Sequence, residues 1–207
     1  MKINNIKIED FVNYKKPSLF IGMGSCNWKC CYEANIPITR CQNNELNGYK
    51  TEVEVRSLVD AYMRNSVTQA IVIGGLEPFS DFINLLDLVS ALRAKTEDDI
   101  VIYTGYYPHE LTEYLIKLSE YDNIIIKFGR FKPNEKPVKD EVLGVELASG
   151  NQYAVKLNKG SKEIIKAMQE NSGFCPCMIK QSSDTLCCCK AFRNKKSGEC
   201  HCGIFSK

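Results

Sequence analysis

Four cysteines lie within a sixteen-residue polar loop near the N-terminus, at positions 26, 30, 31 and 41. The loop follows the apolar run Leu19–Ile21, which is typical of a buried strand. A packed core has no need of four thiols in a polar, glycine-flanked loop, whereas thiolates are the preferred ligands of iron–sulfur clusters. Three thiolates would leave one iron free for another ligand. The loop therefore predicts a metal cluster.

The other seven cysteines lie near the C-terminus, after a long stretch that contains none. They form three short groups: Cys175 and Cys177; Cys187, Cys188 and Cys189; Cys200 and Cys202. Static disulfides are rare in a reducing cytosol, so eleven cysteines favour metal or redox use. Two groups so far apart predict two separate inorganic sites.

Length and composition predict a soluble globular protein. The 207 residues suffice for one ordinary domain and a small appendage, with 44% hydrophobic and 25% charged residues. A net charge of +2 gives no case for nucleic-acid binding. No apolar run approaches the roughly 18 residues of a membrane span, and the first residues lack the apolar core of a signal peptide. We expect a cytoplasmic protein with no nucleic-acid or membrane partner.

Short apolar runs alternate with amphipathic segments in the first 126 residues. The apolar runs predict buried strands, and the helical periodicity between them predicts helices at 55–63, 82–89 and 108–118. Thr51 and Glu54 have the spacing of a capping box, and Pro108 suits the first turn of a helix. This alternation predicts an α/β fold with a mostly parallel sheet, whose strands are expected at 19–21, 70–73, 100–103 and 124–126.

Three loops follow strands of the expected sheet: the cysteine loop, Gly74–Pro78 and Thr104–Tyr106. The carboxyl ends of parallel strands share one edge, and ligands of such sheets bind there. The glycines at 74 and 75 would let the backbone approach a ligand closely. We therefore expect the three loops to form one site.

The C-terminal part is expected to be a separate small domain. A last strand is predicted near 151–155, and Ser161 suits the cap of a helix that ends before Gly173. Residues 171–207 contain too few aliphatic side chains for a core of their own, so a metal is expected to hold them together. The predicted domains are residues 1–158 and 159–207.

Several motifs beside the cysteine loop occur in a recognisable order. They are Gly-Gly-Leu-Glu-Pro at 74–78, Ile-Tyr-Thr-Gly-Tyr at 102–106, Phe-Gly-Arg-Phe at 128–131 and Ser-Gly-Asn-Gln at 149–152. With these motifs, the first 155 residues resemble the radical SAM activating enzymes, most closely the small activases of anaerobic (class III) ribonucleotide reductase.

The resemblance implies a partial (βα) barrel and a 4Fe-4S cluster on three cysteines, whose fourth iron binds S-adenosylmethionine. One-electron cleavage then gives a 5′-deoxyadenosyl radical, which removes a hydrogen from a glycine of the reductase. Glu77 or exposed carbonyls would hold the ammonium group, and Thr104–Tyr106 would lie near the nucleoside. The implied cofactor-binding residues are Gly74, Gly75, Glu77, Pro78, Thr104 and Tyr106.

The cysteine spacing departs from the family pattern, in which two residues separate the second and third ligands. Counting on from Cys30 leads to Glu33. The ligands are therefore Cys26, Cys30 and Cys41, with Cys31 left over, or Cys31 replaces Cys30. We favour the first set because Cys26 and Cys30 keep the opening spacing of the family. Structural thiols or a zinc site are the alternatives for this loop.

The late cysteines form an ordered signature: Cys-Pro-Cys at 175–177, Cys-Cys-Cys at 187–189 and Cys-His-Cys at 200–202. It resembles the catalytic subunit of ferredoxin–thioredoxin reductase, whose pattern is Cys-Pro-Cys, Cys-Pro-Cys, Cys-His-Cys. The middle element and a shorter first spacer depart from that pattern. A structural zinc or a purely structural cluster is the alternative.

This second resemblance implies an active cysteine pair beside a second 4Fe-4S cluster. Cys177 would attack the target disulfide, Cys202 would sit against the cluster, and His201 would donate a proton. A cluster delivers one electron at a time whereas a disulfide needs two, so a cysteine beside the cluster must hold the half-reduced state. A histidine near pH 7 is a suitable acid. The implied cluster ligands are Cys175, Cys187, Cys189 and Cys200, and Cys188 would be a bystander.

Together the two resemblances predict a radical SAM activase fused to a cysteine-rich, mainly helical iron–sulfur domain, with two 4Fe-4S clusters and S-adenosylmethionine. The expected partners are an anaerobic ribonucleotide reductase, a ferredoxin or flavodoxin, and a thioredoxin-like protein. Residues 171–207 carry a net charge of +4, which suits an acidic electron donor. The tail would supply reduced thiol, or electrons for the first cluster.

Three other functions are compatible with the same residues. The first is a ferredoxin-dependent disulfide reductase whose N-terminal region only positions partners. A second alternative is a radical SAM enzyme that acts on a small molecule or peptide, with the tail as an auxiliary cluster. The third is a non-catalytic metal-binding adaptor.

Overall fold

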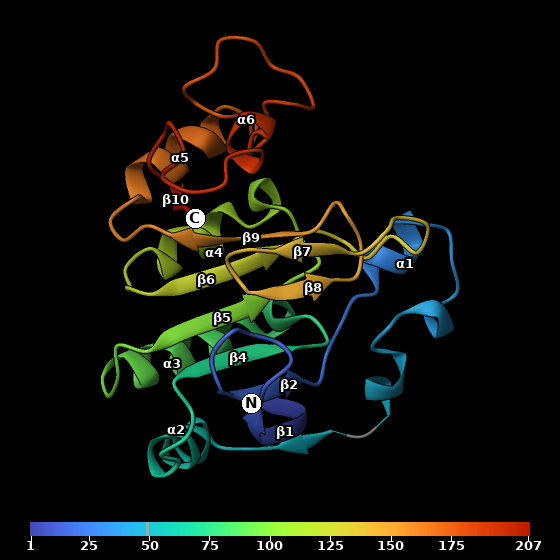
Figure 1. Cartoon of the computed structure of the whole chain (residues 1–207), viewed down its shortest axis with the longest axis vertical. Coiled ribbons are helices and arrows are strands. Elements are labelled where there is room, and N and C mark those ends of the chain that lie inside the picture. The colour runs from blue at the N-terminus through green and yellow to red at the C-terminus, as the bar shows by residue number, and fades with distance from the viewer. Residues whose placement is uncertain (49) are drawn as a thin grey trace.

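The computed structural model describes residues 1–48 and 50–207. These residues form one large mixed sheet, a separate hairpin and several helices (Figure 1). The hairpin consists of β7 (Val138–Asp140) and β8 (Val145–Leu147). In spatial order, the large sheet consists of β10 (Phe205–Ser206), β9 (Tyr153–Leu157), β6 (Ile124–Phe128), β5 (Asp99–Tyr103), β4 (Ala70–Gly75), β2 (Ser18–Met23), β1 (Lys2–Asp10) and β3 (Thr51–Glu52).

The four central strands, β2, β4, β5 and β6, are parallel. Their runs of β-branched residues are buried on both faces, as expected for parallel strands covered on both sides. The outer strands β1 and β9 pair antiparallel with this centre. The predicted α/β class and its mostly parallel central sheet are confirmed.

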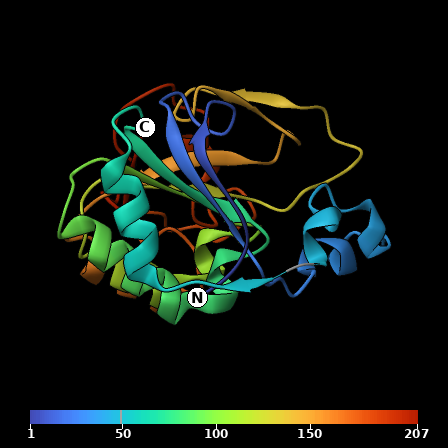
Figure 2. The same cartoon turned by 90° about the horizontal axis from the view of Figure 1, so that it is seen from below.

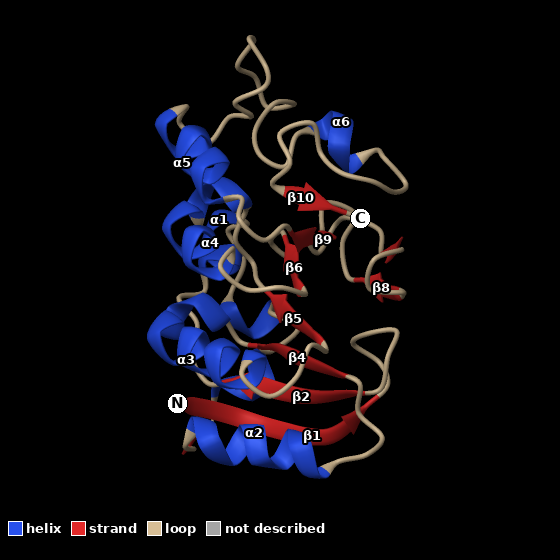
Figure 3. Cartoon of the chain, turned by 90° about the vertical axis from the view of Figure 1, so that its left-hand side faces the viewer, coloured by secondary structure: helices blue, strands red, loops and turns tan. Residues whose placement is uncertain are grey.

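Helices α2 (Val55–Arg64), α3 (Phe82–Arg93), α4 (Thr112–Leu118) and α5 (Lys162–Glu170) cover one face of the sheet, and the hairpin covers part of the other (Figure 3). Along β4, Ile71 and Ile73 belong to the core under the helices, whereas Ala70 and Val72 belong to the core that includes Leu147 of the hairpin. This alternation is the period of two expected of a strand. The remaining helices of the described chain are α1 (Lys29–Glu33) and α6 (Lys190–Arg193).

The predicted capping box at Thr51 is wrong. Thr51 and Glu52 form β3 and pair with the start of β1, so they precede the helix and do not cap it. Helix α2 begins at Val55 after Glu54, whose side chain makes no capping hydrogen bond. Pro108 starts a 3₁₀ turn, Pro108–Glu110, and α4 follows it. Both predicted helices are present near their expected positions, but contacts with distant segments determine where each helix begins.

The tail shares the core of the main sheet. Strand β10 pairs with β9, and Phe205 packs its ring edge against Phe128 with the centroids 5.9 Å apart. Phe192 and Ile204 also belong to the large core under the helices. Two short helices and mostly irregular chain make up residues 159–207, so the expectation of a mainly helical tail is wrong. These apolar contacts stabilise the tail in addition to any metal, and the predicted domain boundary at residue 158 stays a prediction.

None of the described helices is both long and apolar enough to span a membrane.

Candidate metal centre and ligand cavity

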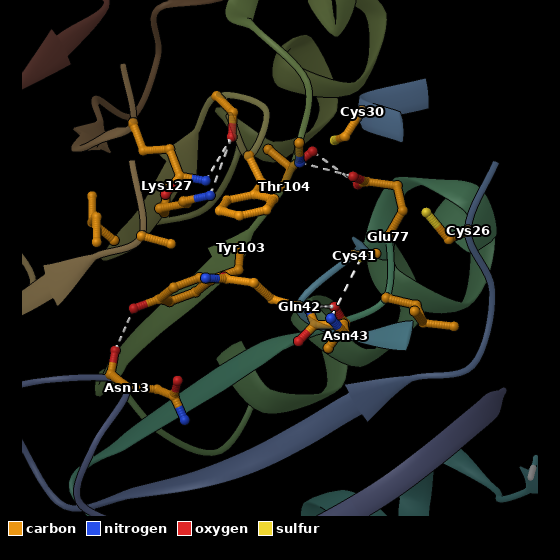
Figure 4. A pocket seen from close by; sticks show the side chains of 18 of the residues that line it. Asn13, Cys26, Cys30, Cys41, Gln42, Asn43, Glu77, Tyr103, Thr104 and Lys127 are labelled. Carbon is orange, nitrogen blue, oxygen red and sulfur yellow. Dashed lines mark hydrogen bonds between the residues drawn. The ribbon is translucent and has the colours of Figure 1, made fainter. Parts of the chain in front are cut away.

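The first four cysteines border a single cavity of about 300 Å³. Cys26 follows β2, Cys30 and Cys31 lie on α1, and Cys41 follows the 3₁₀ turn Ile38–Arg40. Figure 2 shows α1 and the turns after it beyond one end of the sheet, and Figure 4 shows three of the cysteines around the end of β4. The predicted convergence of the cysteine loop with the strand ends is what the structure shows.

Three of the four sulfurs accept a backbone N–H. Trp28 donates to Cys26 at 3.3 Å, Asn43 donates to Cys41 at 3.4 Å, and the Phe131 amide donates to Cys30. Such bonds stabilise a thiolate and are a known means of tuning iron–sulfur clusters. Among the described residues, no backbone N–H donates to Cys31, whose thiol contacts Cys41 instead. The hydrogen bonds therefore distinguish Cys31 from the other three cysteines, and the choice of cluster ligands among the four stays a prediction.

Burial raises the pKa of the Cys26 thiol to about 11, although the Trp28 amide opposes the shift. Burial also raises the pKa values of Cys30 and Cys31. The thiols are therefore protonated at neutral pH, and a bound metal would have to displace these protons. A set of converging soft thiols in a cavity of this size fits an iron–sulfur cluster.

Glu77 bridges the ends of two strands. Its Oε1 accepts hydrogen bonds from the Thr104 hydroxyl at 2.8 Å and the Phe79 amide at 3.1 Å, and its Oε2 accepts from the Gly105 amide at 2.9 Å. Burial raises the pKa of this carboxyl, although all three hydrogen bonds lower it. Glu77 thus holds the loop after β5 against the loop after β4, with its oxygens facing Cys30 and the cavity (Figure 4).

The other predicted cofactor residues divide into two groups. Gly75 and Thr104 border the cavity, and Gly75 has a φ of 77°, which favours glycine. Gly74, Pro78 and Tyr106 are not among the described residues that border it. Pro78 begins a buried 3₁₀ turn, and the Tyr106 hydroxyl accepts a hydrogen bond from Asn27 at 2.5 Å. These three residues lie outside the cavity lining.

Lys127 is a cavity residue that the sequence analysis did not identify. It is only 7% exposed, and its ammonium group donates to the Gly129 carbonyl at 3.2 Å and lies over the Tyr103 ring. Burial lowers the pKa of Lys127 to about 8, against the opposing effects of Cys30 and Glu77. The sequence feature that could have identified Lys127 as a cavity residue is its position directly after three isoleucines, at the end of a parallel strand.

A partly buried charge network fixes α1 to the rest of the site. Arg130 binds both carboxylate oxygens of Glu110, at 2.6 and 2.8 Å, and its Nε lies 2.7 Å from Glu33 on α1. Lys29 of the same helix donates to Glu110 at 2.6 Å. Burial would raise the pKa of Glu110, but the hydrogen bonds from Arg130, Lys29 and the Tyr107 amide lower it to about 2. The Phe-Gly-Arg-Phe motif therefore positions the helix that carries Cys30.

The late cysteines form a second group of thiols. The sulfurs of Cys175 and Cys202 are 3.2 Å apart, and with Cys177 they lie within 4.8 Å of one another. The predicted attacking cysteine, Cys177, and the predicted proton donor, His201, are exposed, whereas Cys202 and the four predicted ligands are buried or half-buried. Cys200 accepts the Phe205 amide at 3.2 Å, and a hydrogen bond from Cys202 lowers its pKa to about 6. The assignment of ligands and redox pair among these cysteines stays a prediction.

Residues 16–152 match the family of 4Fe-4S single cluster domains, and this segment spans more than half of the chain. The chain belongs to that family. The match contains the first four cysteines and ends before the seven late ones, so an iron–sulfur cluster domain is present at the first site. No curated protein and no solved structure matches the chain.

Proposed function

We propose that the chain is a radical SAM activating enzyme that installs a glycyl radical on an anaerobic ribonucleotide reductase. One observation carries this proposal: a single cavity at the carboxyl ends of parallel strands is bordered by the cluster thiols and also by Gly75, Glu77 and Lys127. A cluster domain that only transfers electrons needs no such cavity beside its thiols. The family match supports the cluster, and the cavity supports a second ligand next to it.

When bound, the cluster and S-adenosylmethionine would supply reductive cleavage of the sulfonium and thus the 5′-deoxyadenosyl radical that abstracts hydrogen from glycine. The residues of the chain would bind and orient the two. Cys26, Cys30 and Cys41 are the proposed cluster ligands because their sulfurs accept backbone N–H groups. Lys127 is the buried cation that would pair with the carboxylate of the methionyl group.

Glu77 is better suited to position the loops than to bind the ammonium group, because both its oxygens already accept hydrogen bonds from the protein. The Gly75 carbonyl accepts a hydrogen bond from the Asn43 side chain at 2.5 Å. This contact ties the Cys41 turn to the end of β4, so both would move together. Phe20, Leu46 and Leu147 give the cavity an apolar side for an adenosyl group and for exclusion of water.

The test is anaerobic reconstitution of the full chain, followed by three measurements. We expect about eight irons per chain, formation of 5′-deoxyadenosine with dithionite, and a glycyl-radical EPR signal on an added class III reductase. Cys26→Ser should lose about four irons and the cleavage, while Cys188→Ser should lose neither. Failure to form 5′-deoxyadenosine would contradict the proposal. Cleavage without a radical on the reductase would favour a small-molecule or peptide substrate.

A second function, disulfide reduction, is proposed for the tail because the exposed Cys177 lies within 4.8 Å of Cys175 and Cys202. The Cys177 thiolate would attack the target disulfide and release one target thiol. Cys202 would then displace the second target thiol and leave a Cys177–Cys202 disulfide. Two electrons, delivered singly by a ferredoxin or flavodoxin through the tail cluster, would restore both thiols. The target would be a disulfide of the reductase or of a thioredoxin-like carrier.

The two functions can be separated in one chain. Cys177→Ser should abolish reduction of a disulfide substrate and leave the cleavage of S-adenosylmethionine unchanged. Loss of both activities would indicate that the tail passes electrons to the first cluster.

A further inference from the structure

The first site contains one thiol more than its proposed cluster requires. Cys31 is 2% exposed, and it borders the same cavity as Cys26, Cys30 and Cys41. Its thiol makes a hydrogen bond with the Cys41 sulfur, and its other electrostatic neighbour is Cys30. The Cys31 side chain therefore lies beside the sulfurs of the proposed cluster ligands, at the cavity that they border.

The neighbouring positions of Cys30 and Cys31 on α1 allow both to reach one cluster. Successive residues on a helix point about 100° apart. Two such sulfurs therefore reach different corners of a four-iron cube. Cys30 lies toward Gly105, Glu77 and Lys127, whereas Cys31 lies toward Cys41. All four cysteines border the same cavity.

Hydrogen bonding distinguishes Cys31 from the other three. Each of the others accepts a backbone N–H that favours its thiolate form, and in the described part of the chain Cys31 accepts none. Of the four sulfurs, that of Cys31 is therefore the one that no backbone N–H of the described residues holds in place. It is the one that leaves most readily when another ligand arrives.

We propose that Cys31 ligates the fourth iron of the first cluster in the resting protein and is displaced when S-adenosylmethionine binds. The exchange breaks one iron–sulfur bond and forms bonds from that iron to the amino and carboxylate groups of the ligand. The released Cys31 thiolate takes the proton that the ammonium group of the ligand loses when its nitrogen binds the iron, and no electron is transferred. The proposal rests on the proposed function only for the identity of the displacing ligand.

As a consequence, each of the four irons in the resting cluster is bound by a cysteine thiolate. A four-iron cluster with one iron lacking a thiolate loses that iron readily on mild oxidation, and full thiolate ligation slows this loss. Cys31 would protect the site until its substrate is present.

The test compares the wild-type chain with Cys31→Ser and Cys31→Ala, each reconstituted anaerobically, with Cys188→Ser as the matched control. All four should contain the same iron and sulfide. After brief oxidation by ferricyanide without S-adenosylmethionine, the two Cys31 variants should show a strong EPR signal of a three-iron cluster, and the other two proteins should show a much weaker one. Equilibrium binding should show a severalfold lower Kd for S-adenosylmethionine in the Cys31 variants.

Two results would overturn the proposal. If both Cys31 variants lose about four irons, Cys31 is one of the three indispensable ligands. If the wild type forms the three-iron cluster as readily as the variants, Cys31 does not ligate at rest. The oxidation measurement contains no S-adenosylmethionine. It therefore stays decisive even if the chain proves not to bind that ligand.

Discussion

A β-carbon at Gly105 would lie 2.7 Å from the Cys30 sulfur, closer than such atoms can approach. The loop after β5 therefore touches the helix that carries the second proposed cluster ligand. This contact joins two segments that lie 75 positions apart in the chain. Glycine at 105 is required for the position of Cys30 as well as for the shape of the loop.

The first prediction concerns this contact. Gly105→Ala should displace Cys30 and reduce the iron bound at the first site by up to about four atoms per chain. Gly48→Ala is the matched control, because a β-carbon at Gly48 would meet no atom within 4 Å. Iron analysis and the EPR spectrum of the reduced protein measure the effect. Full iron and an unchanged spectrum in Gly105→Ala would show that Cys30 does not ligate.

The second prediction separates the binding role of Lys127 from its cost in stability. Burial lowers the pKa of Lys127 from 10.5 to about 8, so its protonated form destabilises the fold at pH 7. Lys127→Met should stabilise the metal-free protein by on the order of 3 kcal/mol and should weaken binding of S-adenosylmethionine.

The pH dependence of this effect has a defined sign. The penalty is fully present below pH 8 and disappears as the pH rises toward 10.5, so the wild type should approach the variant in stability over that range. Chemical denaturation from pH 7 to 10 measures the difference, with the exposed Lys139→Met as the control. A destabilised Lys127→Met would mean that the lysine has a structural role.

The third prediction concerns the charge network on α1. Hydrogen bonds from Arg130, Lys29 and the Tyr107 amide outweigh burial and lower the pKa of Glu110 from 4.5 to about 2. The resulting stabilisation is present above pH 4.5 and is lost as the pH falls toward 2. Glu110→Gln should destabilise the protein by on the order of 2 kcal/mol at pH 7, since the pair is only partly shielded from solvent.

Urea unfolding at several pH values between 7 and 3 would measure this loss. The difference between wild type and Glu110→Gln should shrink on acidification. Glu163→Gln removes an exposed pair with Lys166 and should change stability little. A difference that stays constant with pH would show that the carboxylate charge is not the source of the stabilisation.

The fourth prediction tests the order of thiol exchange in the tail. If the exposed Cys177 attacks first, Cys202→Ser should accumulate a mixed disulfide between Cys177 and the target, because the second step is blocked. Cys188→Ser should accumulate none. Mass spectrometry without reductant identifies the adduct. An adduct on Cys175 instead would reverse the assigned roles.

The fifth prediction concerns the attachment of the tail. Phe205 is 1% exposed and packs against Phe128 of β6. Phe205→Ala should cost about 3–5 kcal/mol and should lower the unfolding midpoint of the whole chain. Ile179→Ala, at a fully exposed position, should have little effect. If only the tail unfolds in Phe205→Ala, the chain contains two independent domains.

Local patterns in the sequence were sufficient for the central fold. The isoleucine and valine runs of β4, β5 and β6 are continuous, and only parallel strands covered on both faces bury such runs completely. Strand β9 was predicted near 151–155, but β1 and β10 were missed for the opposite reason. Residues of β1 are largely exposed, and the two residues of β10 carry no period at all.

The sequence by itself determined the presence of a cysteine-based metal centre and its place at one edge of a parallel sheet. Metal ligation is the most favourable role for four cysteines in a polar loop, and the carboxyl ends of parallel strands lie together at one edge of the sheet. Only the tertiary structure distinguished the four thiols, because the N–H donor for Cys30 comes from Phe131, one hundred residues further along the chain. It alone placed Lys127 in the cavity and turned Glu77 into a bridge between loops. These features arise from hydrogen bonds and packing between segments that are distant in the sequence. The spacing of residues along the chain therefore could not predict them.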